Sequence, residues 1–318
     1  PLTGHEVVRR GHVRAGGMIA ANLEEGRFYE HDQIIDELAG EHPYDKWLKN
    51  VKELEEEIIQ GEEPRLYDKE ALMRRQMVAG FTLETSELIL APMAETGKEA
   101  IGSMGDDSPV AVLSNECRPL SHFFRQNFSQ VTNPPVDPLR EDRVMSLKTR
   151  FKNLGNILTT DETQQNVFVL ESPFLSTGMY QRLMETLGEG VEHIDCTFKL
   201  DDVMRDGRAL KVALARIQAE AEEAVRAGRE HIVLTDEHQD PDNVGIPMIL
   251  ATGAVHSHLV SQGLRTFCSL TVRSAECLDT HYFAVLVGCG ATCVNAYLAQ
   301  EAIADRHARG LLGDEPLS

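Results

Sequence analysis

Hydrophobic residues recur along this chain in two different patterns, which divide it near residue 98. Over residues 1–98 they mostly follow steps of three and four, the spacing of one face of an α-helix. From about residue 166 to residue 304, short β-rich runs alternate with helical runs. The pattern therefore predicts a helical connector segment over residues 1–98 and a central α/β domain over residues 99–318.

The first region is predicted to hold three helices behind a short hairpin. Residues 13–29 indicate two short strands joined by a turn. A helix is predicted over residues 44–60, where apolar side chains recur at helical spacing and the outer face is acidic. A second, over residues 68–79, begins with an aspartate suited to the N-cap and has a glycine just beyond its end. The third starts near Leu83, and Pro92 either kinks it or begins a new piece.

The second region is predicted to consist of βα units. The expected strands cover residues 166–170, 193–198, 231–235, 266–272 and 291–295, and the expected helices cover 177–187, 207–227, 247–262, 276–287 and 298–306. This alternation is typical of a mainly parallel sheet covered by helices. Five units fall short of the eight of a closed TIM barrel. The sheet is therefore open, partial, or completed by strands between Val110 and Leu147.

Composition narrows the class of protein. The 318 residues are 42% hydrophobic and 26% charged, which is typical of a folded globular chain. The formal net charge of −20 argues against binding to a nucleic-acid backbone. No run approaches the roughly 20 apolar residues that a membrane span needs, and no signal peptide is recognisable. The six cysteines form no CxxC pair and read as reduced core residues, so we expect a cytoplasmic protein without nucleic-acid or membrane partners.

Two short motifs invite a functional interpretation. Gly288-Cys289-Gly290 lacks the third glycine and the strand-then-helix context of a dinucleotide fingerprint, so we interpret it as a helix end and a tight turn. The loop over residues 235–243 (TDEHQDPDN) follows a strand and carries Asp236 and His238. Its oxygen and imidazole groups could ligate a metal, but acidic loops after strands are more often only solvated. No catalytic triad or nucleophile signature is recognisable.

The densest run of unusual residues lies between residues 101 and 147. Its beginning, GSMGDDSP, contains Asp106 and Asp107 and is a turn signal in front of the apolar run VAVL, which is predicted to be a strand. The later words TNPP and VDP contain three prolines that force an extended path. Such a stiff polar loop suits a functional site or an interface, and a buried structural connector is the alternative.

The sequence motifs of this run also resemble those of a known family. GSMGDD, PVAVLS, QVTNPPVDPLRE and VMSL resemble the central domain of glutamate synthase large chains. The resemblance continues upstream through RAGGMIAANLEEGRFYEHDQIIDELAGEHPYDKWL and downstream through VFVLESPFLS, IPMILATGAVHSHLV and CSLTVRSAE to GCGATCVNAYLA. It covers nearly the whole chain. Where the family is expected to have GRMLLVD, this sequence has GGMIAAN.

The resemblance implies a fold and a role. In this family an amidotransferase domain with an N-terminal cysteine precedes the central domain, and an FMN-binding barrel with an iron-sulfur cluster follows it. The chain begins with Pro1 and ends after LLGDEPLS, so both active sites are expected to lie outside it, and it is expected to bind no cofactor or metal itself. The family's central domain is a reduced relative of the FMN barrel, which implies an incomplete TIM-barrel-like α/β fold. The implied partners are the neighbouring domains and either an NADPH-oxidising small subunit or ferredoxin.

The resemblance also implies site residues. In the family, ammonia released from glutamine travels inside the protein to the flavin, and the central domain helps to wall that path. By resemblance, Gln130, Thr132 and Asn133, together with Asp106 and Asp107, would line the path or an interdomain loop, with Thr132 the first choice. Two alternatives stay open: a stand-alone barrel-like enzyme with a ligand near Asp236, His238 and Asn295, and a free-standing subunit of a larger assembly.

Overall fold

The computed structural model describes residues 6–54, 58–100, 111–115, 118–125, 140, 144–199 and 207–312. Tertiary contacts divide the chain into two compact units, Pro1–Asn50 and Val51–Ser318. The domain boundary expected between residues 98 and 99 stays a prediction.

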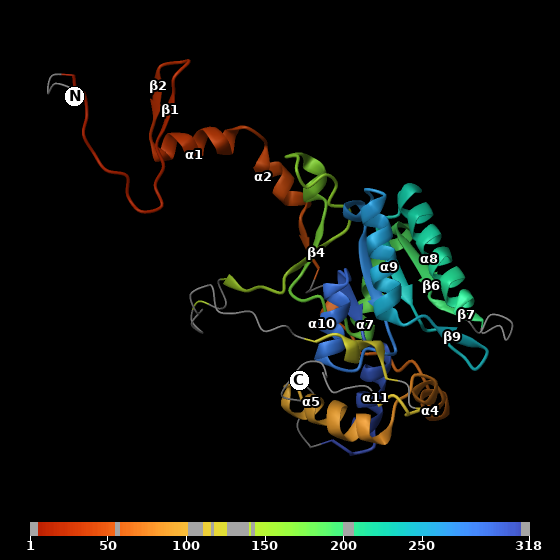
Figure 1. Cartoon of the computed structure of the whole chain (residues 1–318). Coiled ribbons are helices and arrows are strands. Elements are labelled where there is room, and N and C mark those ends of the chain that lie inside the picture. The colour runs from red at the N-terminus through yellow and green to blue at the C-terminus, as the bar shows by residue number, and fades with distance from the viewer. Residues whose placement is uncertain are drawn as a thin grey trace. The chain divides into compact units, whose positions relative to one another are not determined.

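The first unit contains a hairpin followed by helices (Figure 1). β1 (Ala20–Asn22) pairs antiparallel with β2 (Arg27–Tyr29), as the sequence pattern predicted. Helices α1 (His31–Gly40) and α2 (Tyr44–Trp47) follow, and the 3₁₀ turn η1 (Leu48–Asn50) ends the unit.

The helix predicted over residues 44–60 is interrupted in its middle. After η1 the chain forms β3 (Lys52–Glu53), which pairs in parallel with β5 (Phe168–Leu170), and Ile58 and Ile59 are helical again. The apolar positions are used as core all the same, since Leu54 and Ile58 are each only 1% exposed. A strand partner distant in sequence therefore overrides the local helical spacing.

The other helices of the first hundred residues match the prediction. α4 (Lys69–Val78) begins at Asp68, whose carboxylate accepts a hydrogen bond from the Ala71 N–H at 2.8 Å. Farther along, η2 (Thr85–Leu90), a π-helical stretch, leads directly into α5 (Ala91–Thr96). Pro92 lies in the first turn of α5 and has no N–H to donate, which explains the irregular ladder just before it.

The described parts of the segment before residue 148 do not supply the extra strands that the sequence left open. In its described parts, residues 111–115, 118–125, 140 and 144–147, there is no strand, and the described part of VAVL forms a turn. The short 3₁₀ helix η3 (Leu120–Phe123) lies in one of these parts. In its described residues the strand expected at VAVL is therefore wrong, because Val112 and Leu113 lie in a turn and are exposed.

The second unit is built on a parallel sheet of four strands in the order β11-β10-β8-β6. These are β6 (Val191–Asp195), β8 (His231–Thr235), β10 (Ser269–Arg273) and β11 (Cys293–Asn295). From β6 to β11, each strand pairs with the next of the four strands along the chain. Each βα unit therefore adds its strand beside the previous one, in one direction across the sheet. The predicted mainly parallel α/β fold is confirmed.

The connecting helices match the predicted runs and cover the sheet (Figure 1). They are α7 (Thr177–Leu187), α8 (Arg208–Arg226), α9 (Met248–Ser261), α10 (Thr280–Gly288) and α11 (Tyr297–Ala308). Gly288-Cys289-Gly290 ends α10 and turns into β11, as interpreted from the sequence. Smaller elements are η4 (Glu162–Gln165), η5 (Gly188–Gly190), η7 (Arg265–Phe267) and a two-stranded antiparallel sheet of β7 (Thr197–Lys199) and β9 (Asn243–Gly245).

A three-stranded sheet, β3-β5-β4, lies next to the main sheet. β4 (Thr149–Phe151) pairs antiparallel with β5. The chain after β5 reaches the edge of the main sheet that β11 forms. There the Leu175 N–H donates to Val294 O at 2.9 Å, and the Val294 N–H donates to Pro173 O at 2.8 Å. The polypeptide between β5 and α7 thereby lies alongside β11.

The two faces of the main sheet bury different kinds of side chain. One face packs Ile232, Leu234, Leu270 and Val272 against the helices in the largest core cluster. The alternate positions face the second cluster, which includes Phe151, Phe168, Tyr180 and Val233. This second face also carries polar residues, and at the carboxyl ends of the strands they meet.

Candidate functional site

The carboxyl ends of the central strands bring three polar side chains into one row. Thr235 of β8 lies opposite Arg273 of β10, and Arg273 lies opposite Asn295 of β11. Asp236 and Glu237 follow β8 directly. The carboxyl edge of a parallel sheet is where α/β proteins most often place chemistry, so this row is the candidate site.

Arg273 is the centre of the row. Its guanidinium donates from Nε to Glu237 Oε2 at 3.0 Å and from Nη2 to Glu237 Oε1 at 3.1 Å, while Nη1 donates to Asn295 Oδ1 at 2.8 Å. The rings of Tyr180 and Tyr297 lie 4.7 and 4.8 Å from the guanidinium carbon. With its side chain only 4% exposed, Arg273 is held by a carboxylate, an amide and two aromatic faces.

The ion pair controls the charge states in this row. Burial by itself raises the pKa of Glu237, but the hydrogen bond and charge of Arg273 outweigh it, and the net pKa is lowered. For Arg273 burial lowers the pKa, and the bonds to Glu237 more than reverse this. Both side chains are therefore charged at neutral pH.

Two residues from the chain before the sheet, Tyr67 and Arg75, cover the row at Glu237. Tyr67 donates its hydroxyl to Glu237 Oε1 at 3.4 Å, and Arg75 of α4 donates Nη1 to the Glu237 carbonyl at 2.5 Å. The Arg75 guanidinium also lies 4.5 Å from the centre of the Tyr67 ring. Burial, followed by the Glu237 charge, raises the pKa of Tyr67 to about 12, so its hydroxyl remains a donor.

Asp236 occupies a separate, fully buried position beside the row. It accepts hydrogen bonds from the Ala275 N–H at 2.9 and 3.0 Å, from the Tyr297 hydroxyl at 3.1 Å and from the Ser274 hydroxyl at 3.4 Å. Burial, with the Glu276 charge second, raises the pKa of Asp236 to about 7. The carboxyl group is used to join β8, β10 and α11.

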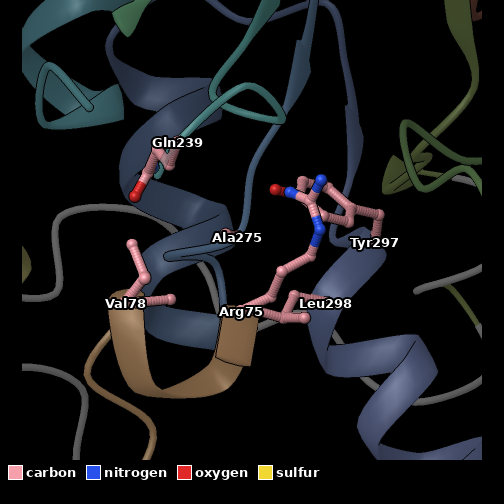
Figure 2. Close-up of a pocket in the computed structure, with 7 residues that line it drawn as sticks. Arg75, Val78, Gln239, Ala275, Tyr297 and Leu298 are labelled. Carbon is pink, nitrogen blue, oxygen red and sulfur yellow. The ribbon is translucent and has the colours of Figure 1, made fainter. Parts of the chain in front are cut away.

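Little space is left at this edge. Figure 2 shows the pocket between α4 and α11, with Arg75 reaching toward Tyr297 and with Val78 and Gln239 on its other side. Its volume is about 10 Å³. That is room for about one water molecule, so the described residues around this pocket leave no space for an organic cofactor or substrate.

The loop that carried the metal hypothesis uses its side chains internally. Asp240 accepts from the N–H groups of Asp242 and Asn243 and from Asn243 Nδ2, each at 2.8 Å. His238 is exposed, while Asp236 and Glu237 have the partners described above. Within the described residues no three His, Cys, Asp or Glu side chains are grouped so that they could hold a metal ion.

Some of the predicted site residues lie together in the structure, and others do not. Asp236 and Asn295 come together around Arg273 and Tyr297, whereas His238 is exposed. Gln130, Thr132, Asn133, Asp106 and Asp107 all lie outside the described residues. The sequence reasoning missed Arg273. Its signal was an arginine that ends the otherwise buried run SLTVR, because a charge in such a run needs a nearby partner.

Comparison with known proteins identifies related sequences. The model of a family described as "Glutamate synthase central domain" matches residues 74–317. The "Glutamate synthase [NADPH] large chain" of Azospirillum brasilense is 56% identical over 316 residues, which is 98% of this chain and 21% of that protein. The "Ferredoxin-dependent glutamate synthase, chloroplastic" of Spinacia oleracea is 36% identical over 304 residues, 95% of this chain and 18% of that protein.

A "Glutamate synthase [NADPH] large chain" from Bacillus subtilis is 35% identical over 297 residues, which is 92% of this chain and 19% of the relative. The chain thus spans about a fifth of the length of the curated relatives that it matches. Within the described residues, no helix is long and apolar enough to cross a membrane.

Proposed function

This chain belongs to the glutamate synthase central domain family, and from that premise we propose that it is a non-catalytic domain of a glutamate synthase. The parent reaction would be the conversion of glutamine, 2-oxoglutarate and a reductant into two glutamates. The domain would join a glutaminase domain to an FMN-dependent synthase domain. FMN and the iron-sulfur cluster would be held by other parts of the parent protein.

The observation that carries the non-catalytic role is the filled carboxyl edge of the sheet. Barrel enzymes bind their ligands at this edge, in a space walled by the loops after the strands. Here Arg273 and Glu237 occupy the centre, Tyr67 and Arg75 cover them, and the pocket that the described residues leave beside them, about 10 Å³, fits a single water. The same packing disfavours the alternative of a stand-alone enzyme with a ligand near Asp236 and Asn295.

We further propose that the domain is a reduced relative of an FMN barrel. Three features support this: parallel strands that are neighbours in chain order, the helices α8 to α11 that pack on one face, and polar residues such as Thr271 and Arg273 on the other. The stretch around Leu175, which pairs with β11, lies where a further strand of a barrel would lie.

The ammonia path is part of the same proposal and rests on the resemblance. Gln130, Thr132 and Asn133, with Asp106 and Asp107, would contribute to its wall or to an interdomain loop. A hydroxyl such as that of Thr132 suits a neutral ammonia path, because it donates or accepts a hydrogen bond without protonating ammonia. The electron donor, NADPH through a small subunit or ferredoxin, would be chosen elsewhere in the parent, since relatives of both types match this chain over 92–98% of its length.

The experiment compares the 318-residue chain with a full-length parent glutamate synthase. We expect the full-length protein to show flavin absorbance and glutamine hydrolysis, and the 318-residue chain to show neither, even after incubation with FMN. Fluorescence titration with FMN, together with a thermal-shift screen of FMN, nucleotides and divalent metals, provides the readout. Flavin bound to the short chain at one-to-one stoichiometry, or glutaminase activity in it, would contradict the proposal.

A further inference from the structure

A second cavity lies at the opposite, amino edge of the main sheet. It has a volume of about 340 Å³ and lies where β6 and β8 begin and α7 ends. Its walls include Lys152, Phe168, Leu187, Glu189, Glu230 and His231. The volume is within the range of about 300–1,000 Å³ that is typical of small-molecule sites, in contrast to the one-water pocket at the carboxyl edge.

The cavity presents charges of both signs to its interior. Lys152 Nζ lies 3.1 Å from Glu230 Oε2, and these side chains are 20% and 30% exposed. Glu189 also lines the cavity, and the carboxyl end of the eleven-residue helix α7 adds partial negative charge. Phe168 lies 5.4 Å from Lys152 Nζ and gives the wall an apolar face.

His231 adds an unused polar group. Its ring is fully buried, and Nε2 lies 2.9 Å from the Thr271 hydroxyl. Nδ1 is buried without any hydrogen-bond partner. Buried polar atoms normally have a partner, so this nitrogen is an unused polar atom in a residue that lines the cavity.

Lys152 is also held in an unusual backbone conformation. Its φ of 108° falls in the region that favours glycine, and it is the one non-glycine residue with positive φ among those described. Ser269 clamps it on both sides: the Lys152 N–H donates to Ser269 Oγ at 2.6 Å, and Ser269 Oγ donates to the Lys152 carbonyl at 3.1 Å. Backbone strain of this kind is commonly retained where it positions a side chain for binding.

We propose that this cavity binds a free amino acid in its zwitterionic form. The ligand carboxylate would contact Lys152, and its ammonium group would contact Glu230 and Glu189. An apolar side chain would lie against Phe168 and Leu187. A dicarboxylate would meet the two carboxylates of the wall and a simple amine would meet Lys152, so a molecule with both charges close together fits best.

The test measures binding of L-leucine to the full-length protein by isothermal titration calorimetry at pH 7.5. Two controls each lack one charge: N-acetyl-L-leucine has no ammonium group, and L-leucinamide has no carboxylate. We expect saturable binding of L-leucine with a Kd near or below about 1 mM, and binding at least about tenfold weaker for both controls.

Variants connect that binding to this cavity. Lys152→Met and Glu230→Gln each remove one charge, and we expect either to weaken L-leucine binding about tenfold or more. The matched control is Lys148→Met, because Lys148 pairs with Glu171 at 2.7 Å and does not line the cavity. It should bind L-leucine like the unchanged protein.

A filling variant tests the site without removing a charge. A Cβ built on Gly190 meets no atom within 4 Å, so Gly190→Leu should extend into free space and block the ligand while the protein keeps its thermal midpoint. The proposal is overturned if L-leucine does not bind, if both one-charge controls bind as well as it does, or if binding survives in all three cavity variants.

Discussion

The guanidinium of Arg273 and the carboxylate of Glu237 form a two-point ion pair, with Nε to Oε2 at 3.0 Å and Nη2 to Oε1 at 3.1 Å. The pair joins β10 to the loop after β8, and two tyrosine rings and Asn295 enclose the guanidinium. Such geometry orients both groups rigidly, so its loss should affect folding more than chemistry.

Arg273→Met should therefore destabilise the protein by about 2–4 kcal/mol. It leaves Glu237 without its partner, and the cost stays below that of a fully buried pair because the Glu237 side chain is 32% exposed. Chemical denaturation measures the change. In a full-length enzyme, kcat per folded molecule should stay within about twofold, whereas loss of a transition-state contact would lower it by about a hundredfold or more.

Two further variants control for this effect. Arg309→Met removes an exposed pair with Asp305 and should cost about 0–1 kcal/mol. The double variant Arg273→Met/Glu237→Gln should be less destabilised than the sum of its single changes, since no unpaired charge remains. Strict additivity would show that the pair is not coupled.

Asp236 predicts a pH dependence of stability. Its pKa is raised from 3.8 to about 7 in the folded protein, so between these values the folded state holds a proton that the unfolded state has released. The free energy of unfolding should therefore fall as pH rises from about 4 to about 7, by at most about 1.4 kcal/mol per pH unit from this group. Below about 4 the group contributes nothing, and above about 7 the full cost is present.

Asp236→Asn isolates that contribution. The amide keeps the shape of the carboxyl group but cannot titrate. As pH rises from 4 to 7, the unchanged protein should therefore lose unfolding free energy relative to the variant. Urea midpoints collected across that range give the measurement. A difference that does not change with pH would mean that Asp236 is ionised in the folded state throughout.

Gly290 is a position that should tolerate no side chain. Its φ is 117°, and a Cβ placed there would overlap the His256 imidazole, which is already bonded to Arg265 Nε at 3.0 Å. Gly290→Ala should therefore cost about 2 kcal/mol or more in unfolding free energy. Gly310→Ala is the matched comparison, with φ at 66° and open space around its Cβ, and should cost about 1 kcal/mol. Equal effects would rule out the steric overlap.

Thr132→Val tests the ammonia path. In a full-length glutamate synthase we expect folding to be retained while glutamine hydrolysis runs ahead of glutamate formation, because the valine cannot hydrogen-bond to ammonia in transit. The measured quantity is the ratio of the two rates under identical conditions, with Thr159→Val as a control far along the chain. If the ratio stays constant, Thr132 has no role in the path.

The βα half of the fold was predictable because its local signals agree with its tertiary structure. The runs that form α7, α8 and α9 have caps and apolar positions that favour a helix, and those that form β8 and β10 are continuous buried strands. Asp236 and Asn295 could be chosen as site candidates because each closely follows or ends a strand. Their polar types at a carboxyl edge are visible in the sequence.

β3 could not be predicted, because Lys52 and Glu53 are residues with low strand propensity. They form a strand only because the fold places them beside β5, which is more than 100 residues away in sequence. The role of Arg273 was equally hidden, since its partners Glu237, Tyr180, and Asn295 with Tyr297 come from three segments far apart in sequence. The cavity beside His231 depends on Lys152, whose positive φ no sequence pattern indicated.

The sequence by itself determined the alternation of strands and helices and the family to which the chain belongs. Both can be recognised from local residue patterns, without knowing which distant residues meet in the fold. Only the tertiary structure decided that, among the described residues, the carboxyl edge is closely packed and the amino edge holds a cavity. That difference depends on whether side chains far apart in sequence meet: Arg75 and Tyr67 reach Glu237 at one edge, while the described side chains leave a space between Lys152 and His231 at the other.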